Sequence, residues 1–285
     1  MRVGVVVVAS GRGFFRLVGG IRFPKVMEEI GGEPMVSRVV RAVMEAGIGS
    51  VIVVVVNPVF GLAIETALAT FGFNSCKYVV QPRRRGAAEA LMRAMPLLRK
   101  EGVTDFLAIY ADMPLWTAET IASLVDLHHR EKPLLSMTTV TLNGMHPPEL
   151  ERYGRVIRDS GDAIRYIVEP ARTPEELAAC TVNPSLWIWG REWFTKYAPD
   201  VIPVHRGDGF EPEQYVPPLV ATAAKQRGQI AEFSLKDPWE ALGVNTMQEL
   251  ALVRHINHTR TISGTLDGLG RQKIWTITVP EADSI

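Results

Sequence analysis

Two glycines near the start of the chain are placed to bind phosphate. The apolar run of residues 5–9 ends in Ser10-Gly11-Arg12-Gly13. Only a residue without a Cβ lets backbone N–H groups approach an anion closely. The stretch is also rich in cations within fourteen positions, namely Arg12, Arg16, Arg22 and Lys25. A polyphosphate ligand would explain so much positive charge, whereas a simple turn would not need it.

Known glycine loops match this stretch poorly. The dinucleotide-binding motif requires a third glycine where the chain has Arg16, and a P-loop requires Gly-Lys-Ser/Thr, which the stretch lacks. An ordinary tight turn stays open as the alternative.

A second candidate anion site follows the strand predicted over residues 76–80. Gln81 comes directly after this strand, and Gly86 precedes a helix predicted over 87–98, whose free N–H groups favour anions. Both are therefore candidate ligand-binding residues. The arginines at 83–85 are expected to lie at the rim.

Asp112 is the candidate acid. It follows the apolar strand predicted over 105–111, and an acid that faces a basic phosphate loop suggests a hard divalent cation between them. Alternatively, Asp112 caps the helix that begins near Thr117.

Alternating strands and helices would position these residues. Apolar runs predict buried strands, and helical stripes predict helices between them: strands over 5–9, 51–56, 76–80 and 105–111, helices over 35–46, 59–70 and 87–98. This βαβ spacing predicts a parallel sheet with helices on both faces. Ligands bind beyond the carboxyl ends of such strands, so Gly11 and Asp112 should share a crevice.

From about residue 133 the pattern becomes antiparallel. The predicted strands are 134–140, 181–189, 230–235 and 273–279, and residues 153–157 are predicted to pair with 163–168 in a hairpin. The predicted helices start at Thr173 and cover 192–197 and 214–227, and a last helix runs from Asn245 or Thr246 to about 257. The fold class expected is α/β, with a Rossmann-like, mixed but mainly parallel sheet and a smaller antiparallel lobe.

The composition excludes several classes of protein function. Of 285 residues, 31 are Lys or Arg and 31 are Asp or Glu, so the zero net charge gives no overall attraction to nucleic acid or anionic membranes. No apolar run is long enough to span a bilayer, and a cytoplasmic location is expected. Cys76 and Cys180 are expected as buried residues, and His128-His129 as solvated surface.

The chain resembles the sugar-1-phosphate nucleotidyltransferases, most closely the uridylyltransferase half of bifunctional N-acetylglucosamine-1-phosphate uridylyltransferase. The resemblance covers about residues 3–250 and rests on several motifs in order: Gly11-Arg12-Gly13, Pro24-Lys25, Gln81 with Gly86, Tyr110-Ala111-Asp112, Tyr153-Gly154-Arg155, Val168-Glu169, Asn183 and Gly243-Val244-Asn245.

The resemblance implies a role for each residue. Arg12, Lys25 and Asp112 would be catalytic, with Asp112 and Asn245 holding one Mg²⁺. The nucleotide would be bound by Gly11, Gly13, Gln81 and Gly86, and the sugar by Gly154, Glu169 and Asn183. The implied substrates are a nucleoside triphosphate, most readily UTP, and a sugar 1-phosphate, giving a nucleoside-diphosphate sugar such as UDP-N-acetylglucosamine. Residues 1–250 would form the transferase domain, and 251–285 a helix with a short extension.

Some positions depart from the family pattern. Phe14-Phe15-Arg16 replaces the family's Thr-Arg-Met, and Pro184-Ser185 follows Asn183 in place of Thr-Gly. No hexapeptide repeat of an acetyltransferase β-helix follows residue 250. Two alternatives stay open: a non-catalytic sugar-nucleotide sensor, and a transferase that uses CTP or GTP.

Overall fold

Valine-rich strands form the centre of one ten-stranded sheet. The computed structural model describes residues 1–11, 13–205, 211–226 and 230–267. Strand β1 (Val3–Ala9) lies between β6 (Ile52–Val56) and β8 (Asp105–Tyr110), and both pairings are parallel. Strand β7 (Lys77–Val80) extends this parallel half beyond β6. The predicted parallel core is confirmed.

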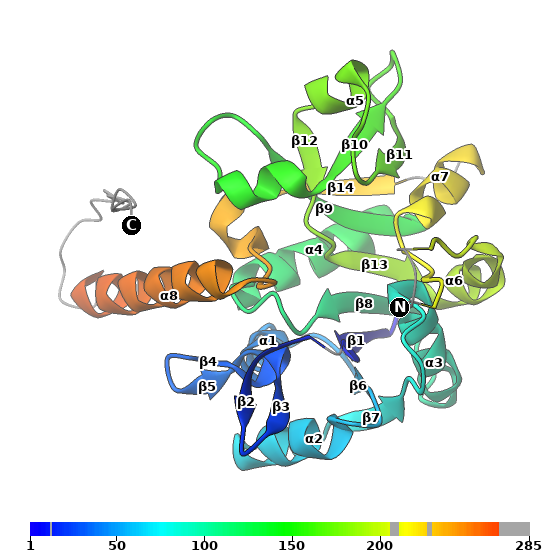
Figure 1. Cartoon of the computed structure of the whole chain (residues 1–285). Coiled ribbons are helices and arrows are strands. Elements are labelled where there is room, and N and C mark those ends of the chain that lie inside the picture. The colour runs from blue at the N-terminus through cyan, green and yellow to red at the C-terminus, as the bar shows by residue number, and fades with distance from the viewer. Residues whose placement is uncertain (12, 206–210, 227–229, 268–285) are drawn as a thin grey trace.

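The antiparallel strands continue the same sheet rather than forming a separate one. The strand order is β11-β10-β12-β9-β13-β8-β1-β6-β7, and β14, unlike the other strands added here, pairs in parallel, with β9. The additional strands are β9 (Leu135–Thr141), β10 (Gly154–Arg158), β11 (Ile164–Val168), β12 (Thr181–Asn183), β13 (Trp187–Gly190) and β14 (Ile230–Ser234). The fold class is therefore α/β with a large mixed sheet, as expected, and Figure 1 shows the antiparallel strands rising away from the parallel half.

Helices cover both faces of the sheet (Figure 1). One core contains side chains of α1 (Met35–Glu45), α2 (Gly61–Thr70), α4 (Ala118–Glu131) and α8 (Met247–Asp267). The other contains side chains of α3 (Ala87–Lys100), α6 (Arg191–Tyr197) and α7 (Pro218–Lys225). The helix α5 (Pro174–Ala178) starts at Thr173 as predicted and buries no residue, and its Thr173 cap forms a capping box with Glu176. No helix among the residues that the structure describes is long and apolar enough to cross a membrane.

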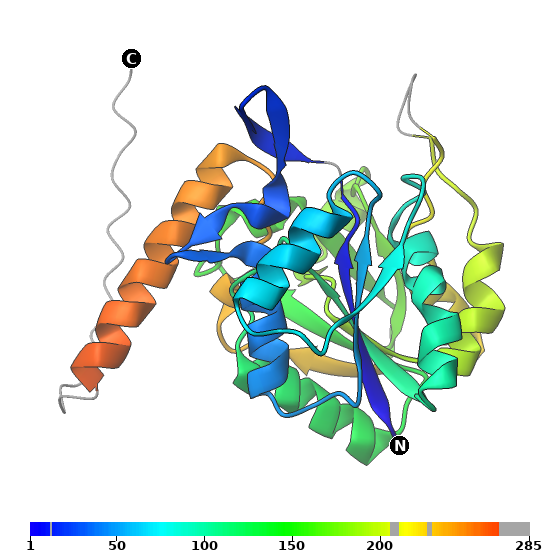
Figure 2. The same cartoon turned by 90° about the horizontal axis from the view of Figure 1, so that it is seen from below.

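The basic stretch after Gly13 is a hairpin and not the irregular loop expected. Strands β2 (Phe14–Val18) and β3 (Ile21–Pro24) pair antiparallel, and the hairpin stands out from the body of the molecule (dark blue in Figure 2). Arg16 stacks on Phe23 and Arg22 on Phe14. A 3-10 turn, η1 (Lys25–Met27), and the two-residue strands β4 (Glu29–Ile30) and β5 (Glu33–Pro34) then lead to α1.

Other boundaries also differ from those predicted. The single strand expected over 181–189 is two strands, because residues 184–186 leave the sheet around Ser185, whose φ is +62°. The helix expected over 214–227 is shorter than predicted: α7 covers only Pro218–Lys225, because the pair Pro217-Pro218 sets its start. The last helix begins after Thr246 as predicted but continues to Asp267, and the expected strand over 273–279 lies outside the described residues. The remaining 3-10 turns are η2 (Pro148–Arg152), η3 (Ala198–Asp200) and η4 (Pro238–Ala241).

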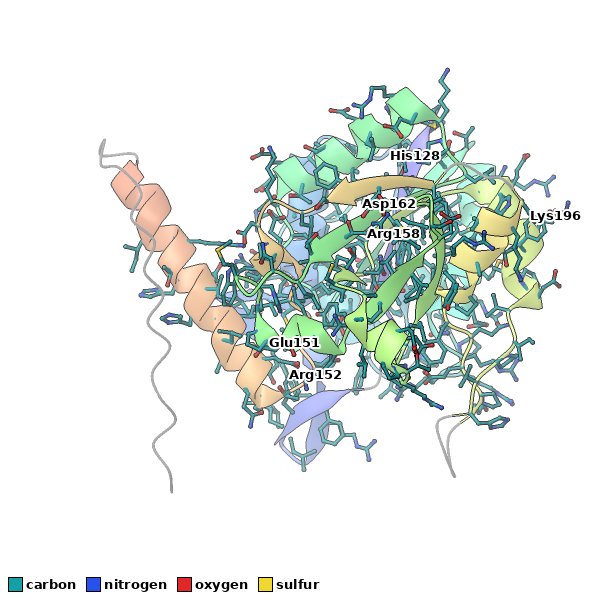
Figure 3. The ribbon with its side chains drawn as sticks, turned by 90° about the horizontal axis from the view of Figure 1, so that it is seen from above. His128, Glu151, Arg152, Arg158, Asp162 and Lys196 are labelled. Carbon is teal, nitrogen blue, oxygen red and sulfur yellow. The ribbon has the colours of Figure 1, made fainter. Side chains whose placement is uncertain are left out.

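The prediction that His128 is solvated surface is wrong. His128 is fully buried on α4 (labelled in Figure 3), and its ring nitrogens lie 2.8 Å from Ser136 Oγ and 3.3 Å from Asp105 Oδ1. It therefore ties α4 to β9 and β8. Cys76 is buried as expected, but Cys180 is exposed.

Candidate active site

A cleft of about 460 Å³ lies beyond the carboxyl ends of the parallel strands. Pockets of this volume are typical for small-molecule ligands. Eight of the predicted site residues line it: Gly11, Gly13, Lys25, Gln81, Gly86, Asp112, Glu169 and Asn245. The strands place several of them, because β1, β7 and β8 end just before Ser10, Gln81 and Ala111. Arg12 lies outside the described residues.

Lys25, Asp112 and Asn245 converge in this cleft. The Lys25 ammonium donates to Asp112 Oδ2 at 2.7 Å and to Asn245 Oδ1 at 2.9 Å. Lys25 and Asn245 are 220 positions apart in the chain. A backbone hydrogen bond holds the segments of the two acceptors together, since Val244 N–H donates to Asp112 O at 2.8 Å. A second backbone hydrogen bond ties Lys25 to the glycine loop, because Lys25 N–H donates to Gly13 O.

The alternative role of Asp112 as a helix cap is not observed. Thr117 caps α4 instead, its hydroxyl accepting from Thr120 N–H. Glu240, from η4, also accepts from Thr117 N–H at 3.0 Å. The Asp112 carboxylate is therefore directed toward Lys25 and the cleft.

The donor atoms suit a hard divalent cation. Carboxylate and amide oxygens are the ligands that Mg²⁺ prefers, and Mg²⁺ commonly takes one or two carboxylates together with substrate phosphates. Asp112 Oδ2 and Asn245 Oδ1 already approach one positive group, the Lys25 ammonium. Among the described residues no group of three or more His, Cys, Asp or Glu is placed to hold a metal. Substrate phosphate oxygens or water would complete the coordination of a cation here.

Hydrogen bonds fix the orientation of the buried Gln81 amide. Its Nε2 donates to Gly86 O at 3.0 Å and to Glu89 Oε2 at 2.7 Å. Because both partners are acceptors, the nitrogen must face them, which leaves Oε1 as the acceptor end. Gly86 has φ +87°, and a Cβ there would lie 2.3 Å from Gln214 O, so glycine is required at this position.

The glycine loop is held by a residue that sequence reasoning missed. Asn57, which is buried at the end of β6, donates to Gly11 O at 3.0 Å and to Ser10 O at 3.3 Å. A Cβ added at Gly11 would have no other atom within 4 Å, so one side of this loop is open.

The predicted sugar-binding residues separate into two groups. Glu169 lines the cleft, whereas Gly154 and Asn183 are buried and do not line it. The Asn183 amide donates to Thr138 O, and its Oδ1 accepts from Ser185 N–H at 3.0 Å. Asn183 thus shapes the turn that brings Ser185 to the cleft. A Cβ at Gly154 would lie 3.5 Å from Glu169 Oε2.

Further polar residues line the cleft beside the predicted ones. Tyr215 donates to Glu213 Oε2 at 3.0 Å, and Arg84 lies 2.6 Å from Glu213 Oε1. Arg84 is thus part of the lining and not only of the rim. Tyr110 also lines the cleft, and burial raises the pKa of its phenol, with Asp112 adding to the effect. Glu213 and Tyr215 had no signal in the sequence, because isolated polar residues on connecting segments show no periodicity that would reveal them.

The fold and the cleft define a class of nucleotidyltransferases. Residues 5–186 match the model of the MobA-like NTP transferase domain, and the chain belongs to this family. It is 31% identical to the bifunctional protein GlmU of Methylococcus capsulatus, covering 90% of this chain and 51% of that protein. It is 26% identical to GlmU of Brevibacillus brevis over 92% of this chain. The chain spans about half the length of these relatives.

Solved structures share the fold at lower identity. A nucleotidyl transferase from Methanothermobacter thermautotroptrophicus superposes with a TM-score of 0.58 at 18% identity, covering 91% of this chain and 99% of that one. A CMP:2-keto-3-deoxy-manno-octonic acid synthetase complexed with CTP gives a TM-score of 0.62 at 15% identity, covering 91% of this chain and all of that one. These likenesses establish the architecture.

Proposed function

We propose that this chain is a Mg²⁺-dependent sugar-1-phosphate nucleotidyltransferase that prefers UTP and forms UDP-N-acetylglucosamine or a related UDP-sugar. The observation that carries the proposal is the convergence of Lys25, Asp112 and Asn245 beside the glycine loop. An ammonium, a carboxylate and an amide oxygen in one cleft suit phosphate and a divalent cation. Cytoplasm, where nucleoside triphosphates are available, is the proposed location.

In the proposed reaction a phosphate oxygen of the sugar 1-phosphate attacks the α-phosphorus of the triphosphate. The new P–O bond forms as the bond from the α-phosphorus to the α,β-bridging oxygen breaks, and pyrophosphate leaves with that electron pair. Such transfers require alignment and charge neutralisation more than covalent chemistry from the protein. Bound Mg²⁺ would neutralise phosphate charge and orient the reacting oxygens.

Each residue in the cleft has a proposed task. The backbone at Gly11 and Gly13, with Arg12, would hold the β- and γ-phosphates. Lys25 would move from its contacts with Asp112 and Asn245 to the reacting phosphates as those two residues take the metal. Asp112 and Asn245 would hold the cation, whose charge would take the place of the ammonium beside the carboxylate.

Gln81 and Gly86 would read the base. With its nitrogen bonded to protein acceptors, Gln81 offers Oε1, which suits the N3–H of uracil; the corresponding N3 of cytosine is an acceptor and would repel it. This contrast supports UTP over CTP.

The sugar would bind beside Glu169, which accepts from hydroxyls. Gly154 and Asn183 would act indirectly: the glycine leaves room for Ile167 of the neighbouring strand β11, which leads to Glu169, and the asparagine places Ser185. We further propose residues 1–250 as the transferase domain, with 251–285 forming the rest of α8 and a short extension.

Pyrophosphate release from a panel of triphosphates and sugar 1-phosphates tests the proposal. UTP with N-acetylglucosamine 1-phosphate should give Mg²⁺-dependent release, and Lys25→Ala should lower kcat by about 10²- to 10³-fold. Release only with CTP or GTP would overturn the base assignment. If no pair is turned over but a UDP-sugar binds, the chain is a sensor.

A further inference from the structure

Asn57 ties the segment that follows β6 to the glycine loop that follows β1. It comes directly after β6, as Ser10 comes directly after β1, and the parallel register of these neighbouring strands pairs Val56 with Ala9 (Figure 1). The two residues therefore lie beyond the carboxyl ends of the strands, where open α/β sheets bind their ligands. Asn57 is only 1% exposed and does not line the cleft, so any effect on a ligand there must pass through other residues.

Every hydrogen-bonding position of the Asn57 amide is occupied. Its Nδ2 donates to Gly11 O at 3.0 Å and to Ser10 O at 3.3 Å. Its Oδ1 accepts from Val59 N–H and Phe60 N–H, both at 2.9 Å. An amide offers two N–H donors and an oxygen with two lone pairs, so these four contacts fix its orientation. One side chain thus holds the glycine loop with its nitrogen and the turn before α2 with its oxygen.

The bond from Asn57 to Ser10 O orients the first peptide group of the loop. In a planar trans peptide the C=O and N–H groups point to opposite sides. Because Ser10 O is directed at Asn57, the N–H of Gly11 is directed away from it, and no group of the described residues accepts from this N–H. Gly11 is exposed and lines the cleft, so its N–H is available to an anionic ligand there.

The glycine loop is held at both ends. Lys25 N–H donates to Gly13 O at 2.8 Å, and Asn57 holds Ser10 and Gly11. Glycine loses more conformational freedom on ordering than any other residue, so a ligand that had to order a free glycine loop would bind more weakly. Hydrogen bonds that order the loop beforehand remove part of that cost.

We propose that Asn57 is a positioning residue for triphosphate binding, which pre-orders the glycine loop and so raises the affinity of the cleft for the polyphosphate part of the nucleotide. This role rests on the proposed function, in which the loop holds the β- and γ-phosphates. It also accounts for the residue type. An aspartate could keep the bonds from Val59 and Phe60, but it would turn a carboxylate oxygen toward two carbonyl oxygens.

Calorimetric titration of wild type and Asn57→Asp with UTP, UMP and inorganic tripolyphosphate, each with Mg²⁺, tests the proposal. The variant keeps the acceptor for the turn but loses the donor to the loop, so UTP and tripolyphosphate should each bind about ten- to a hundred-fold more weakly. UMP has no β- or γ-phosphate, and its affinity should change by less than about two-fold. A residue that served only the turn would change none of the three affinities, and general damage would weaken all three alike; either result overturns the proposal.

Tripolyphosphate separates a failure of this role from a failure of the proposed function. Equal binding of UTP and of tripolyphosphate to wild type and Asn57→Asp would overturn the role of Asn57 alone. If the wild type binds tripolyphosphate but not UTP, the proposed nucleotide is wrong, while weaker tripolyphosphate binding by the variant still supports the role of Asn57. If the wild type binds neither, the proposed function and the role of Asn57 both fall.

Asn143→Asp is the matched control. Asn143 is exposed, its Oδ1 accepts from Met145 N–H at 3.1 Å, and it does not line the cleft. The same exchange of amide for carboxylate there should leave the binding of all three probes unchanged.

Asn57→Ser separates the lost donor from the added charge and keeps the test decisive if Asn57→Asp fails to fold. Serine is neutral and keeps an oxygen for the turn, but it is too short to reach both loop carbonyls. UTP and tripolyphosphate should bind about three- to ten-fold more weakly, with UMP unchanged. Wild-type affinity of Asn57→Ser for UTP and tripolyphosphate would overturn the proposal.

Discussion

At the scale of single residues, Asp112→Asn separates charge from shape. The amide keeps the size and hydrogen-bonding capacity of the side chain but removes the anion that would hold Mg²⁺. We expect a melting temperature close to wild type and a half-saturating Mg²⁺ concentration raised by about ten-fold or more, since even the loss of an outer-shell partner costs 10- to 100-fold in metal affinity. The Mg²⁺ dependence of pyrophosphate release measures this half-saturating concentration.

The matched control for this change is Asp126→Asn, an exposed acid on α4. It removes the same charge from an exposed position that does not line the cleft. Identical Mg²⁺ curves for wild type and Asp112→Asn would exclude Asp112 as a metal ligand.

Gln81→Ala should change base choice. Removing the amide takes away the acceptor offered to uracil and leaves Gly86 O and Glu89 Oε2 without the Gln81 donor, although Arg93 still donates to Glu89 Oε1. An unpaired polar group costs about 1 to 3 kcal/mol, so the preference for UTP over CTP should narrow by roughly five- to a hundred-fold. The ratio of kcat/KM values measures it, with Gln248→Ala on the exposed first turn of α8 as the control. An unchanged ratio would remove Gln81 from base reading.

At the scale of elements, the sequence predicted the parallel half of the sheet well, but it did not predict the β2–β3 hairpin or the burial of His128. Continuous valine runs are compatible with few structures other than buried strands, so the bounds of β1 and β6 were predicted to within two residues. The β2–β3 hairpin was missed because its side chains are mostly exposed and its stabilising pairs are cation–π contacts, which leave no alternation. His128 was misplaced because its burial depends on Ser136 and Asp105, which lie on other elements.

The tip of the β2–β3 hairpin should be dispensable for folding. Leu17 and Val18 are 60% and 49% exposed, whereas Phe14 and Phe15 line the cleft. Replacing residues 17–21 by Gly-Gly should change the free energy of unfolding by only about 0.5 kcal/mol, as for other surface changes. We expect KM for the triphosphate to rise several-fold, because the cleft wall loses its support. A large loss of stability, or an unchanged KM, would contradict this role.

The contact of α4 with β8 should make stability depend on pH. Burial alone would raise the pKa of Asp105, but hydrogen bonds from His128 and Thr104 outweigh burial and hold the pKa below 3.8. Because the folded carboxyl loses its proton more readily than the unfolded one, it stabilises the fold above about pH 4, and this contribution is lost as the pH falls through the folded pKa. Urea midpoints for Asp105→Asn should therefore fall less steeply than wild type between about pH 5 and 3. Parallel curves would contradict this.

At the scale of the whole molecule, Glu249 links the turn η2 to the segment that carries Asn245. It accepts from Asn245 N–H at 2.6 Å and Thr246 N–H at 2.8 Å, and pairs with Arg152 of η2 at 3.0 Å. Figure 3 labels Arg152 and Glu151 on this turn, beside α8. Glu249 thus fixes the backbone that presents Asn245.

Glu249→Ala should weaken both the helix start and the proposed metal site. Loss of a helix-capping group costs about 0.5 to 2 kcal/mol of stability. We also expect the Mg²⁺ requirement to rise several-fold, because Asn245 loses its anchor. Arg152→Ala, which removes only the exposed partner of the pair, should lower stability by less than about 1 kcal/mol and leave the Mg²⁺ curve unchanged. A normal Mg²⁺ curve for Glu249→Ala would show that Asn245 needs no such support.

The distance of Lys25 from Asn245 along the chain has a consequence for synthesis. A ribosome makes the chain from its N-terminus, and contacts of large sequence separation form late in folding. The central strands β1, β6 and β8 can pair once about the first hundred residues have emerged, but Lys25 must wait for a residue 220 positions later. The nascent chain can thus pair its central parallel strands early, but it brings Lys25, Asp112 and Asn245 together only after residue 245 has emerged.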